Sequence, residues 1–185
     1  MSRFPRVRPA EPPYPDDIQA RFDALMPRGL EPLVLFRTLA RDSRLFWRFA
    51  GGGLLDKGHL TMRQREIVID RVTARCGSEY EWGVHVAFFA RRAGLEEPHL
   101  RSIVHGQAGD ACWHAGEALL IRFCDAVLDD CDVGDALWSD LRAHFSEEAI
   151  LELLLLAGFY RTVSCLTNVL RLPLEPYAAR FPDRA

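Results

Sequence analysis

The sequence predicts an all-α fold, and three observations support this fold class. Apolar residues recur at intervals of three and four, as at Val86, Phe89 and Ala93, which is the spacing of one helix face. No segment alternates apolar and polar residues over five or more positions between turn signals, so we expect no strand. The chain has 185 residues, of which 49% are hydrophobic and 26% charged, as in a single globular domain. We therefore expect a proline-rich N-terminal arm over residues 1–15 and one helical domain over residues 16–185.

The arm and the first helix are separated by a change in composition. Prolines recur through residues 3–15, and because proline lacks a backbone donor, an extended arm is expected that could wrap a neighbouring subunit. Asp16 and Asp17 then suit the N-cap of a helix. This helix should end near Met26, since a proline and Gly29 follow closely.

A second helix is predicted from Pro32 to about Phe49. Proline is well tolerated at a first helical position, and the three glycines at 51–53 end the element. A loop then extends to about Thr61. The apolar positions that define this helix are Leu33, Phe36, Leu39, Leu45 and Phe49.

The remaining helices have clear start and stop signals. Thr61 can cap a helix that ends at Gly77, and Ser78 can cap another that ends at Gly94. The last helix is the most apolar part of the chain, but its internal charges favour a buried helix over a membrane anchor. The later helices are expected over residues 96–105, 113–129, 134–144 and 146–170, the last beginning with Ser146 followed by two glutamates that suit the helix dipole.

Composition excludes several function classes. The net charge of −3 gives no electrostatic attraction to nucleic acid or to anionic lipid. The five cysteines contain no C-x-x-C pair, the six histidines have no metal-ligand spacing, and no glycine-rich phosphate loop is present. The N-terminus lacks the apolar core of a signal peptide. We expect a cytoplasmic protein with reduced thiols and without a metal site.

Residues 63–85 concentrate the ionisable groups that could carry chemistry. Glu81 and His85 are four positions apart, so on one helix the carboxylate can reach the imidazole, raise its pKa and fix its tautomer. If Gly77 lets the two helices pack side by side, Glu66 comes near the same point. Two carboxylates and a histidine in a partly apolar pocket can transfer a proton to and from a substrate.

Structural roles for the same residues remain open. Ser78 and Glu81 have the S-x-x-E form of a capping box, in which the carboxylate only reaches back to the backbone. His85 could be a hydrogen-bonded core residue. Glu66 could lie on a solvated face of ion pairs that includes Asp70.

Three motifs in this order resemble the carboxymuconolactone decarboxylase and alkylhydroperoxidase D-like superfamily. They are R-x-R-E at 63–66, S-x-x-E-W-x-x-H at 78–85 and G-L at 94–95, and the resemblance extends over about 60–172. The peroxidase branch of this superfamily carries C-x-x-C-x-x-x-H, with two reactive cysteines. In that alignment Ser78 and Glu81 replace the cysteines. Neither side chain can form a disulfide, so the dithiol mechanism has lost both sulfurs.

The decarboxylase branch is similar in placing a glutamate four residues before the histidine. The resemblance implies an alkylhydroperoxidase D-like helical bundle that forms trimers or hexamers and acts without a cofactor on a small carbonyl, lactone or carboxylate compound. His85 would be the general acid/base, Glu81 would orient it, and Glu66 would assist proton transfer. The expected substrate-binding residues are Ser78, Tyr80, Trp82, Phe88 and Tyr160, although Tyr80 and Trp82 also suit a packing role.

Two other functions are considered beside this decarboxylase-like lyase. One is an alkylhydroperoxidase or peroxiredoxin-type activity that uses Cys76 with an unseen partner. The other is a non-catalytic helical oligomer or small-molecule binding module, in which Glu81 and His85 serve only as cap and core.

Overall fold

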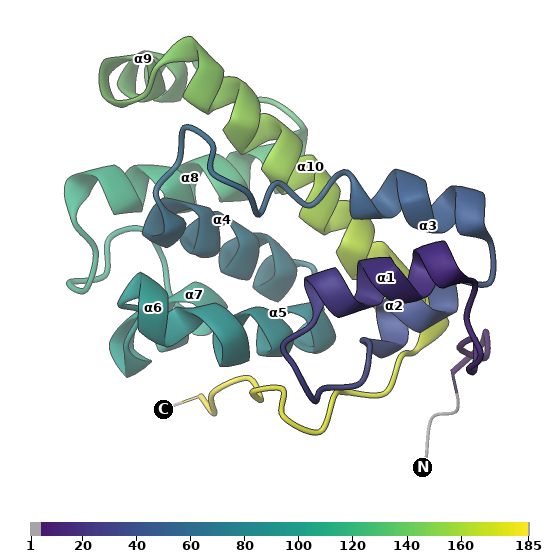
Figure 1. Cartoon of the computed structure of the whole chain (residues 1–185). Coiled ribbons are helices and arrows are strands. Elements are labelled where there is room, and N and C mark those ends of the chain that lie inside the picture. The colour runs from purple at the N-terminus through teal and green to yellow at the C-terminus, as the bar shows by residue number, and fades with distance from the viewer. Residues whose placement is uncertain (1–4, 185) are drawn as a thin grey trace.

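The computed structural model describes residues 5–184, and within them the chain forms helices and loops without a strand. The predicted all-α fold is confirmed. Helix α10 runs from the α9 end of the molecule down to the C-terminal segment (Figure 1). In chain order the elements are α1 (Asp16–Leu25), α2 (Val34–Leu39), α3 (Ser43–Ala50), α4 (Met62–Arg75), α5 (Glu79–His85), the π-helix η1 (Val86–Ala90), α6 (Arg91–Ala93), α7 (Glu97–His105), α8 (Ala115–Asp130), α9 (Asp135–His144) and α10 (Glu147–Leu170).

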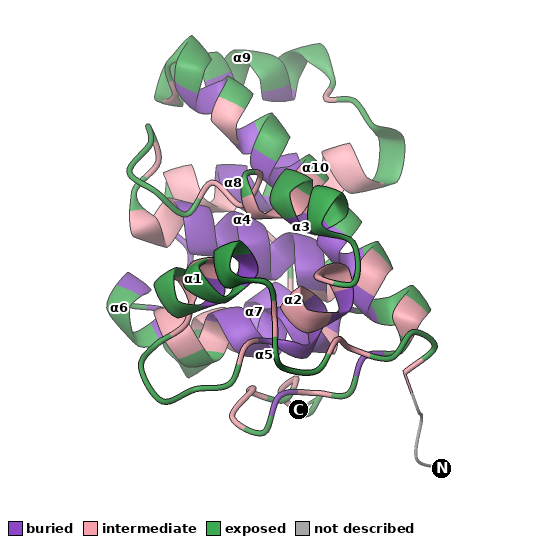
Figure 2. Cartoon of the chain, turned by 45° about the vertical axis from the view of Figure 1, so that its right-hand side comes forward, coloured by how far each residue is buried: buried purple, intermediate pink, exposed green. Residues whose placement is uncertain are grey.

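Helix α4 lies at the centre of the fold and is buried along most of its length (Figure 2). It packs against α8, α10, α5 and α7, and the side chains of Ile67, Val68, Ile69 and Val72 are fully buried. Each such side chain stabilises the fold by about 1.5–3 kcal/mol relative to an exposed one. The helix that carries Glu66 is therefore held on several sides by apolar packing.

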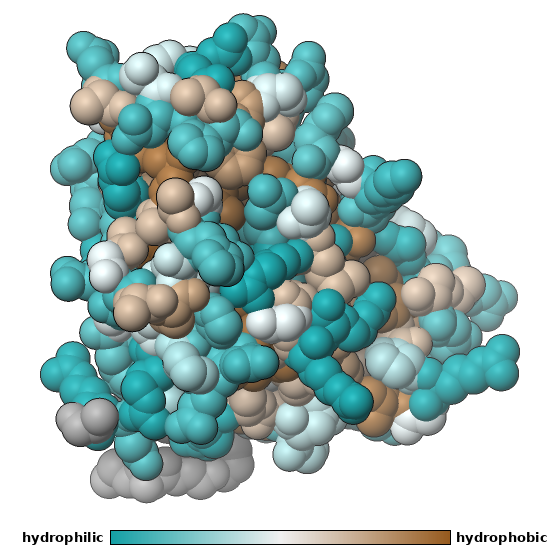
Figure 3. All heavy atoms as spheres, turned by 90° about the vertical axis from the view of Figure 1, so that its left-hand side faces the viewer, coloured by the Kyte–Doolittle hydropathy of each residue, from teal (hydrophilic) through white to brown (hydrophobic). Residues whose placement is uncertain are grey.

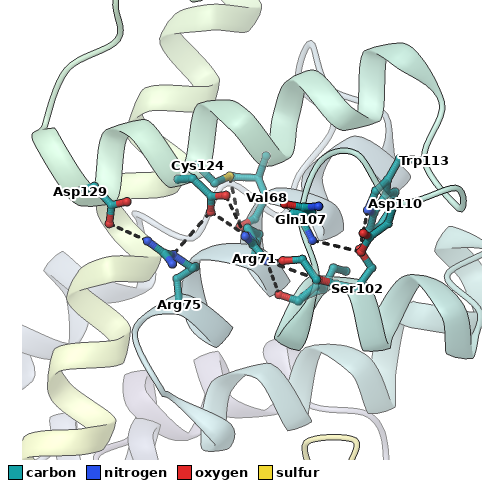
Figure 4. Close-up of polar contacts among 12 residues, drawn as sticks. Val68, Arg71, Arg75, Ser102, Gln107, Asp110, Trp113, Cys124 and Asp129 are labelled. Atoms are coloured by element: carbon teal, nitrogen blue, oxygen red, sulfur yellow. Dashed lines mark hydrogen bonds and ion pairs between the residues drawn. The ribbon is translucent and has the colours of Figure 1, made fainter. Parts of the chain in front are cut away.

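Ion pairs and hydrogen bonds to backbone carbonyls fix the side of α4 that faces α7 and α8 (Figure 4). The guanidinium of Arg71 donates two hydrogen bonds to Asp125 on α8, at 2.8 and 2.7 Å. It also donates to the carbonyl oxygen of Ile103 at the end of α7, at 2.8 Å. One turn later, Arg75 pairs with Asp129 at 2.6 Å. Because a two-pronged arginine–carboxylate contact is strongly directional, it also sets the rotation of α4 about its axis.

The predicted caps of α4 and α5 are present. The hydroxyl of Thr61 accepts from Gln64 N in a full capping box, and Ser78 accepts from Glu81 N at 3.4 Å. Gly77 and Gly94 end the helices with φ of +66°, a conformation that costs glycine little.

The N-terminal helices depart from the prediction in two ways. The expected helix from Pro32 to Phe49 is two helices, because Asp42 caps a new start at α3 by accepting from Leu45 N at 3.0 Å. Leu45 is consequently 45% exposed, and the next residue is buried instead. The expected cap of α1 is also wrong: Pro15 occupies the N-cap, and the two aspartates lie in the first turn without a capping hydrogen bond.

The described N-terminal and C-terminal segments lie against the helices of this same chain. Arg6 N donates to Leu170 O at 2.9 Å, and Ala10 N donates to Arg37 O at 3.0 Å, so the arm binds its own subunit over residues 5–15. The C-terminal segment follows α5, where Ala179 N donates to the carbonyl oxygen of Gly83 at 3.0 Å (Figure 1).

Helix α10 combines a buried face with an exposed apolar face. It is long and apolar enough to cross a membrane by length and composition, yet Leu153, Leu156 and Val163 are fully buried within the core. On its outer side Leu151 and Leu155 are more than 60% exposed. Elsewhere the surface is mixed: the face at the left of Figure 1 is mostly hydrophilic with small hydrophobic patches (Figure 3).

Candidate active site

The candidate site is formed where α4 and α5 pack together. Helix α4 supplies Glu66 and Asp70, one turn apart, and α5 supplies Glu81 and His85, also one turn apart. All four side chains are buried, with the two α4 carboxyls at 0% exposure. Such a group of ionisable side chains is unusual inside a helical core and needs compensating contacts.

Positive and negative side chains alternate along a line formed by Arg65, Glu66, His85 and Glu81. Arg65 Nε donates to Glu66 Oε1 at 3.0 Å, and His85 Nδ1 donates to Glu66 Oε2 at 2.8 Å. On the other side of the imidazole, His85 Nε2 lies 3.5 Å from Glu81 Oε1, which is long for a hydrogen bond but close for an ion pair. The second oxygen of Glu81, Oε2, is buried and has no hydrogen-bond partner among the described residues.

The environment favours the charged form of His85. Burial alone would lower its pKa, but the hydrogen bond and charge of Glu66, followed by those of Glu81, outweigh burial and raise the pKa to about 10. The imidazole is therefore an imidazolium at neutral pH, which donates from Nδ1 to Glu66 and forms an ion pair with Glu81 through Nε2.

Asp70 lies beside these residues but forms no hydrogen bond with them. Neither carboxyl oxygen has a hydrogen-bond partner among residues 5–184. Burial raises its pKa well above the usual value, and the charges of Glu66 and Glu81 raise it further, against an opposing effect of His85. Burial and the two neighbouring carboxylates therefore favour the protonated form of Asp70.

A cavity of about 500 Å³ opens onto Glu81 and His85. It lies between the N-terminal helices on one side and α5, η1 and α10 on the other. The π-helix begins directly after His85, and such local widening is frequent at functional sites. Most of the wall is apolar, contributed by Leu25, Met26, Leu33, Phe36, Phe49, Leu54, Leu55, Val84, Phe88, Phe89, Phe159 and Tyr160, and its charged members are Arg21, Asp56, Glu81 and His85.

The structure brings together five of the eight predicted site residues. Glu66, Glu81 and His85 meet as described, and Phe88 and Tyr160 line the cavity with the last two. The ring of Tyr160 stands edge-on to the imidazole at 5.0 Å.

The other three predicted residues do not line this cavity and have structural partners. Ser78 is hydrogen-bonded to Thr167 at 2.7 Å. Tyr80 donates to Glu175 and accepts from a backbone amide of α2. Trp82 packs against Phe181, with ring centroids 5.1 Å apart. In each case a segment far along the chain covers the side chain, and the structure places these three side chains outside the cavity wall.

The geometry also answers the structural alternatives for the ionisable residues. Ser78 N donates to Thr73 O, not to Glu81, so the capping box is not completed. His85 is buried, at 4% exposure, and lines the cavity. Glu66 and Asp70 are not on a solvated face, since both are at 0% exposure.

Sequence reasoning missed Asp70, Arg65 and Phe89 as parts of the site. Asp70 follows Glu66 by four positions within an apolar stretch, and Phe89 follows His85 by four, so helical spacing was the available signal. The ring of Phe89 lies 5.3 Å from the imidazole and 5.7 Å from the guanidinium carbon of Arg65.

The thiols lie apart from this cavity. All five cysteines are free, and none is among its lining residues. Cys76, at the end of α4, has a pKa raised by burial, with Ser164 and Arg161 lowering it in part. Within residues 5–184 no group of three or more His, Cys, Asp or Glu side chains is arranged to hold a metal ion.

Comparisons with known proteins agree with the fold and with the helix pair that forms the site. The model of the carboxymuconolactone decarboxylase family matches residues 43–121, which include α4 and α5. A crystal structure of an uncharacterized peroxidase-related protein from Silicibacter sp. TM1040 is similar with a TM-score of 0.81 and 16% identity, covering 98% of this chain and 100% of that one. A second, from Ralstonia eutropha JMP134 and described as an alkylhydroperoxidase AhpD core, has a TM-score of 0.77 and 19% identity, covering 94% and 95%. No curated protein matches the sequence.

Proposed function

Since this chain belongs to the carboxymuconolactone decarboxylase and alkylhydroperoxidase D-like superfamily, we propose that it is a cofactor-free acid/base enzyme. Its substrate is a small carbonyl, lactone or carboxylate compound. The reaction is proton transfer at a carbon next to a carbonyl, or decarboxylation through the same enolate.

One observation carries this proposal: an acid/base pair lies in the wall of a cavity, and one of its buried carboxylate oxygens has no hydrogen-bond partner among the described residues. Both ring nitrogens of His85 face carboxylates, whereas Glu81 Oε2 has no partner among the described residues and Glu81 lines the cavity. The group that contacts the substrate proton is therefore Glu81. His85 is the charged residue that holds Glu81 in place, and Glu66 holds His85. The roles of His85 and Glu81 are thus the reverse of those implied by the family resemblance, in which His85 is the general acid/base and Glu81 orients it.

The steps follow from the charges. Glu81 removes a proton from the carbon next to the carbonyl, and the electron pair moves to the carbonyl oxygen as an enolate. In a decarboxylation the bond to the carboxylate breaks instead, carbon dioxide leaves, and the same enolate forms. After proton removal, the proton held by Glu81 returns to the carbon. After decarboxylation Glu81 is still a carboxylate, so the proton comes from the His85 imidazolium, which then regains one from solvent.

The surroundings suit this chemistry. The apolar walls exclude water, so the ionic contacts of His85 are stronger than in solution. Tyr160 stays a neutral phenol because burial, followed by the charges of Glu81 and Glu66, raises its pKa well above the usual value. It can donate a hydrogen bond to the enolate oxygen but cannot act as a base near neutral pH.

Three probe compounds of the proposed class test the function. Phenylpyruvate reports proton removal through deuterium incorporation from heavy water, benzoylacetate reports decarboxylation, and α-angelica lactone reports lactone isomerisation. We expect the protein to accelerate at least one of them, with a loss of about 10²–10⁴-fold in Glu81→Gln. Failure to accelerate any of the three, or equal rates in wild type and Glu81→Gln, contradicts the proposal.

A hydroperoxidase activity is the second candidate, favoured by the description of the two similar crystal structures as peroxidase-related. It would use Cys76, which lies outside the cavity. Hydroperoxide consumption with dithiothreitol, compared between wild type and Cys76→Ser, distinguishes it: turnover lost in the variant supports it, and no turnover in wild type removes it.

Self-association is part of the proposal, as a trimer or hexamer. The support is the outer face of α10, where Leu151, Leu154, Leu155 and Val169 are 43–65% exposed. A cytoplasmic location is also proposed, because all five thiols are free. Sedimentation of the purified protein tests the first of these, and we expect a mass of three or six chains.

A further inference from the structure

One arginine from outside the family match reaches the cavity. Arg21 lies on α1 and is among the lining residues, beside Phe49 and Ala50 of α3. Its Nη2 donates to Ala50 O at 3.2 Å, which links α1 to the end of α3. Its Nε is buried and has no hydrogen-bond partner among the described residues.

The charge of Arg21 is not neutralised by a neighbouring acid. A guanidinium carries a positive charge, and a buried donor atom such as its Nε is costly to leave without a partner. No carboxylate of residues 5–184 lies within ion-pair distance of Arg21. Of the two acids in the cavity wall, Glu81 faces His85, and Asp56 is solvent-exposed.

The rest of the wall has the opposite character. Five phenylalanines and Tyr160 line the same space, together with aliphatic side chains. Aromatic walls of this kind bind flat apolar groups by stacking and edge-to-face contacts, and a few placed polar groups set the orientation.

We propose that Arg21 binds the anionic end of the substrate, whose body is aromatic or similarly apolar. The inference deepens the proposed function, on which it rests for the shared cavity. It defines the substrate class as an apolar monocarboxylate, with its carboxylate at Arg21 and its reacting carbon at Glu81. It also makes the N-terminal helix α1, which precedes the matched segment 43–121, the source of substrate specificity.

Binding of a non-reacting probe tests the proposal. The probe is 3-phenylpropionate, and 3-phenylpropionamide is its neutral counterpart, each titrated calorimetrically into the full chain. Arg21→Met keeps the apolar stem of the side chain and removes its charge. Arg28→Met is the matched control, because Arg28 is exposed and is not part of the cavity wall.

We expect the carboxylate to bind wild type and Arg28→Met equally, and about 10- to 100-fold more weakly to Arg21→Met, as for loss of a charge-assisted hydrogen bond. The amide should bind all three proteins with the same weak affinity. Equal binding of the carboxylate to wild type and Arg21→Met overturns the proposal, and so does a wild type that does not prefer the carboxylate over the amide. Because the experiment measures binding and not turnover, it tests the role of Arg21 even if the protein proves inactive on the proposed substrates.

Discussion

Replacement of Glu66 by glutamine removes the one carboxylate that connects Arg65 to His85. The substitution keeps the shape of the side chain and removes its charge, leaving the buried guanidinium and the imidazolium without their shared partner. Breaking a buried ion pair from one side typically costs about 3–5 kcal/mol. We expect a loss of that size in the free energy of unfolding at neutral pH.

The same substitution changes how stability depends on pH. His85 has a pKa of about 10 in the folded protein, against an ordinary value of 6.5. A raised folded-state pKa stabilises the protein fully below pH 6.5, and this stabilisation is lost as the pH rises through about 10. Since a tenfold change in proton affinity corresponds to about 1.4 kcal/mol, the linked stability is roughly 5 kcal/mol. In Glu66→Gln the pKa of His85 should fall toward its ordinary value, and most of this dependence should disappear.

Urea denaturation between about pH 6 and about pH 10 measures both effects, and NMR titration of the His85 imidazole measures the pKa directly. Glu97→Gln is the control, because Glu97 also pairs with an arginine but its side chain is 79% exposed. Its stability should change by less than about 1 kcal/mol. If Glu66→Gln is as stable as this control and the His85 titration is unchanged, Glu66 does not stabilise the charged imidazole.

Three further substitutions test the frame around the site. Gly83→Ala places a methyl group against a backbone carbonyl of the C-terminal segment, so faster proteolysis of that segment is expected, whereas Gly158→Ala, at a position with open space, should not release it. Asp70→Leu removes a buried acid with a raised pKa, which destabilises the fold as the pH rises above the ordinary aspartate pKa. Urea denaturation of this variant at neutral pH should show a free energy of unfolding higher by about 1–3 kcal/mol and a flatter pH dependence. A loss of stability would show that the acid is paired. Arg71→Lys cannot reproduce the two-pronged contact with Asp125, and a loss of about 1–3 kcal/mol by denaturation is expected; an unchanged midpoint would show that the contact does not hold α4.

The sequence predicted the helical fold and the ionisable centre of the site because both follow from local spacing. The period of apolar residues defines helices, and four-residue spacing places Glu81 next to His85. It did not predict the break between α2 and α3, since the apolar period continues across a cap at Asp42.

The cavity wall was less predictable because it depends on segments distant in the chain. Ser78 and Trp82 share the helix of His85, yet Thr167 of α10 and Phe181 near the C-terminus cover them. Burial of Asp70 has the same origin. Two acids one turn apart resemble a solvated face until neighbouring helices enclose them.

The role of Glu81 is tested most directly by the rate of deuterium incorporation into phenylpyruvate in the presence of wild type, Glu81→Gln and Glu97→Gln. We expect catalysed exchange by wild type and by the exposed control, and a rate lower by about 10²–10⁴-fold in Glu81→Gln. Catalysed exchange that is equally fast in Glu81→Gln would contradict the assignment of Glu81 as the residue that removes the proton.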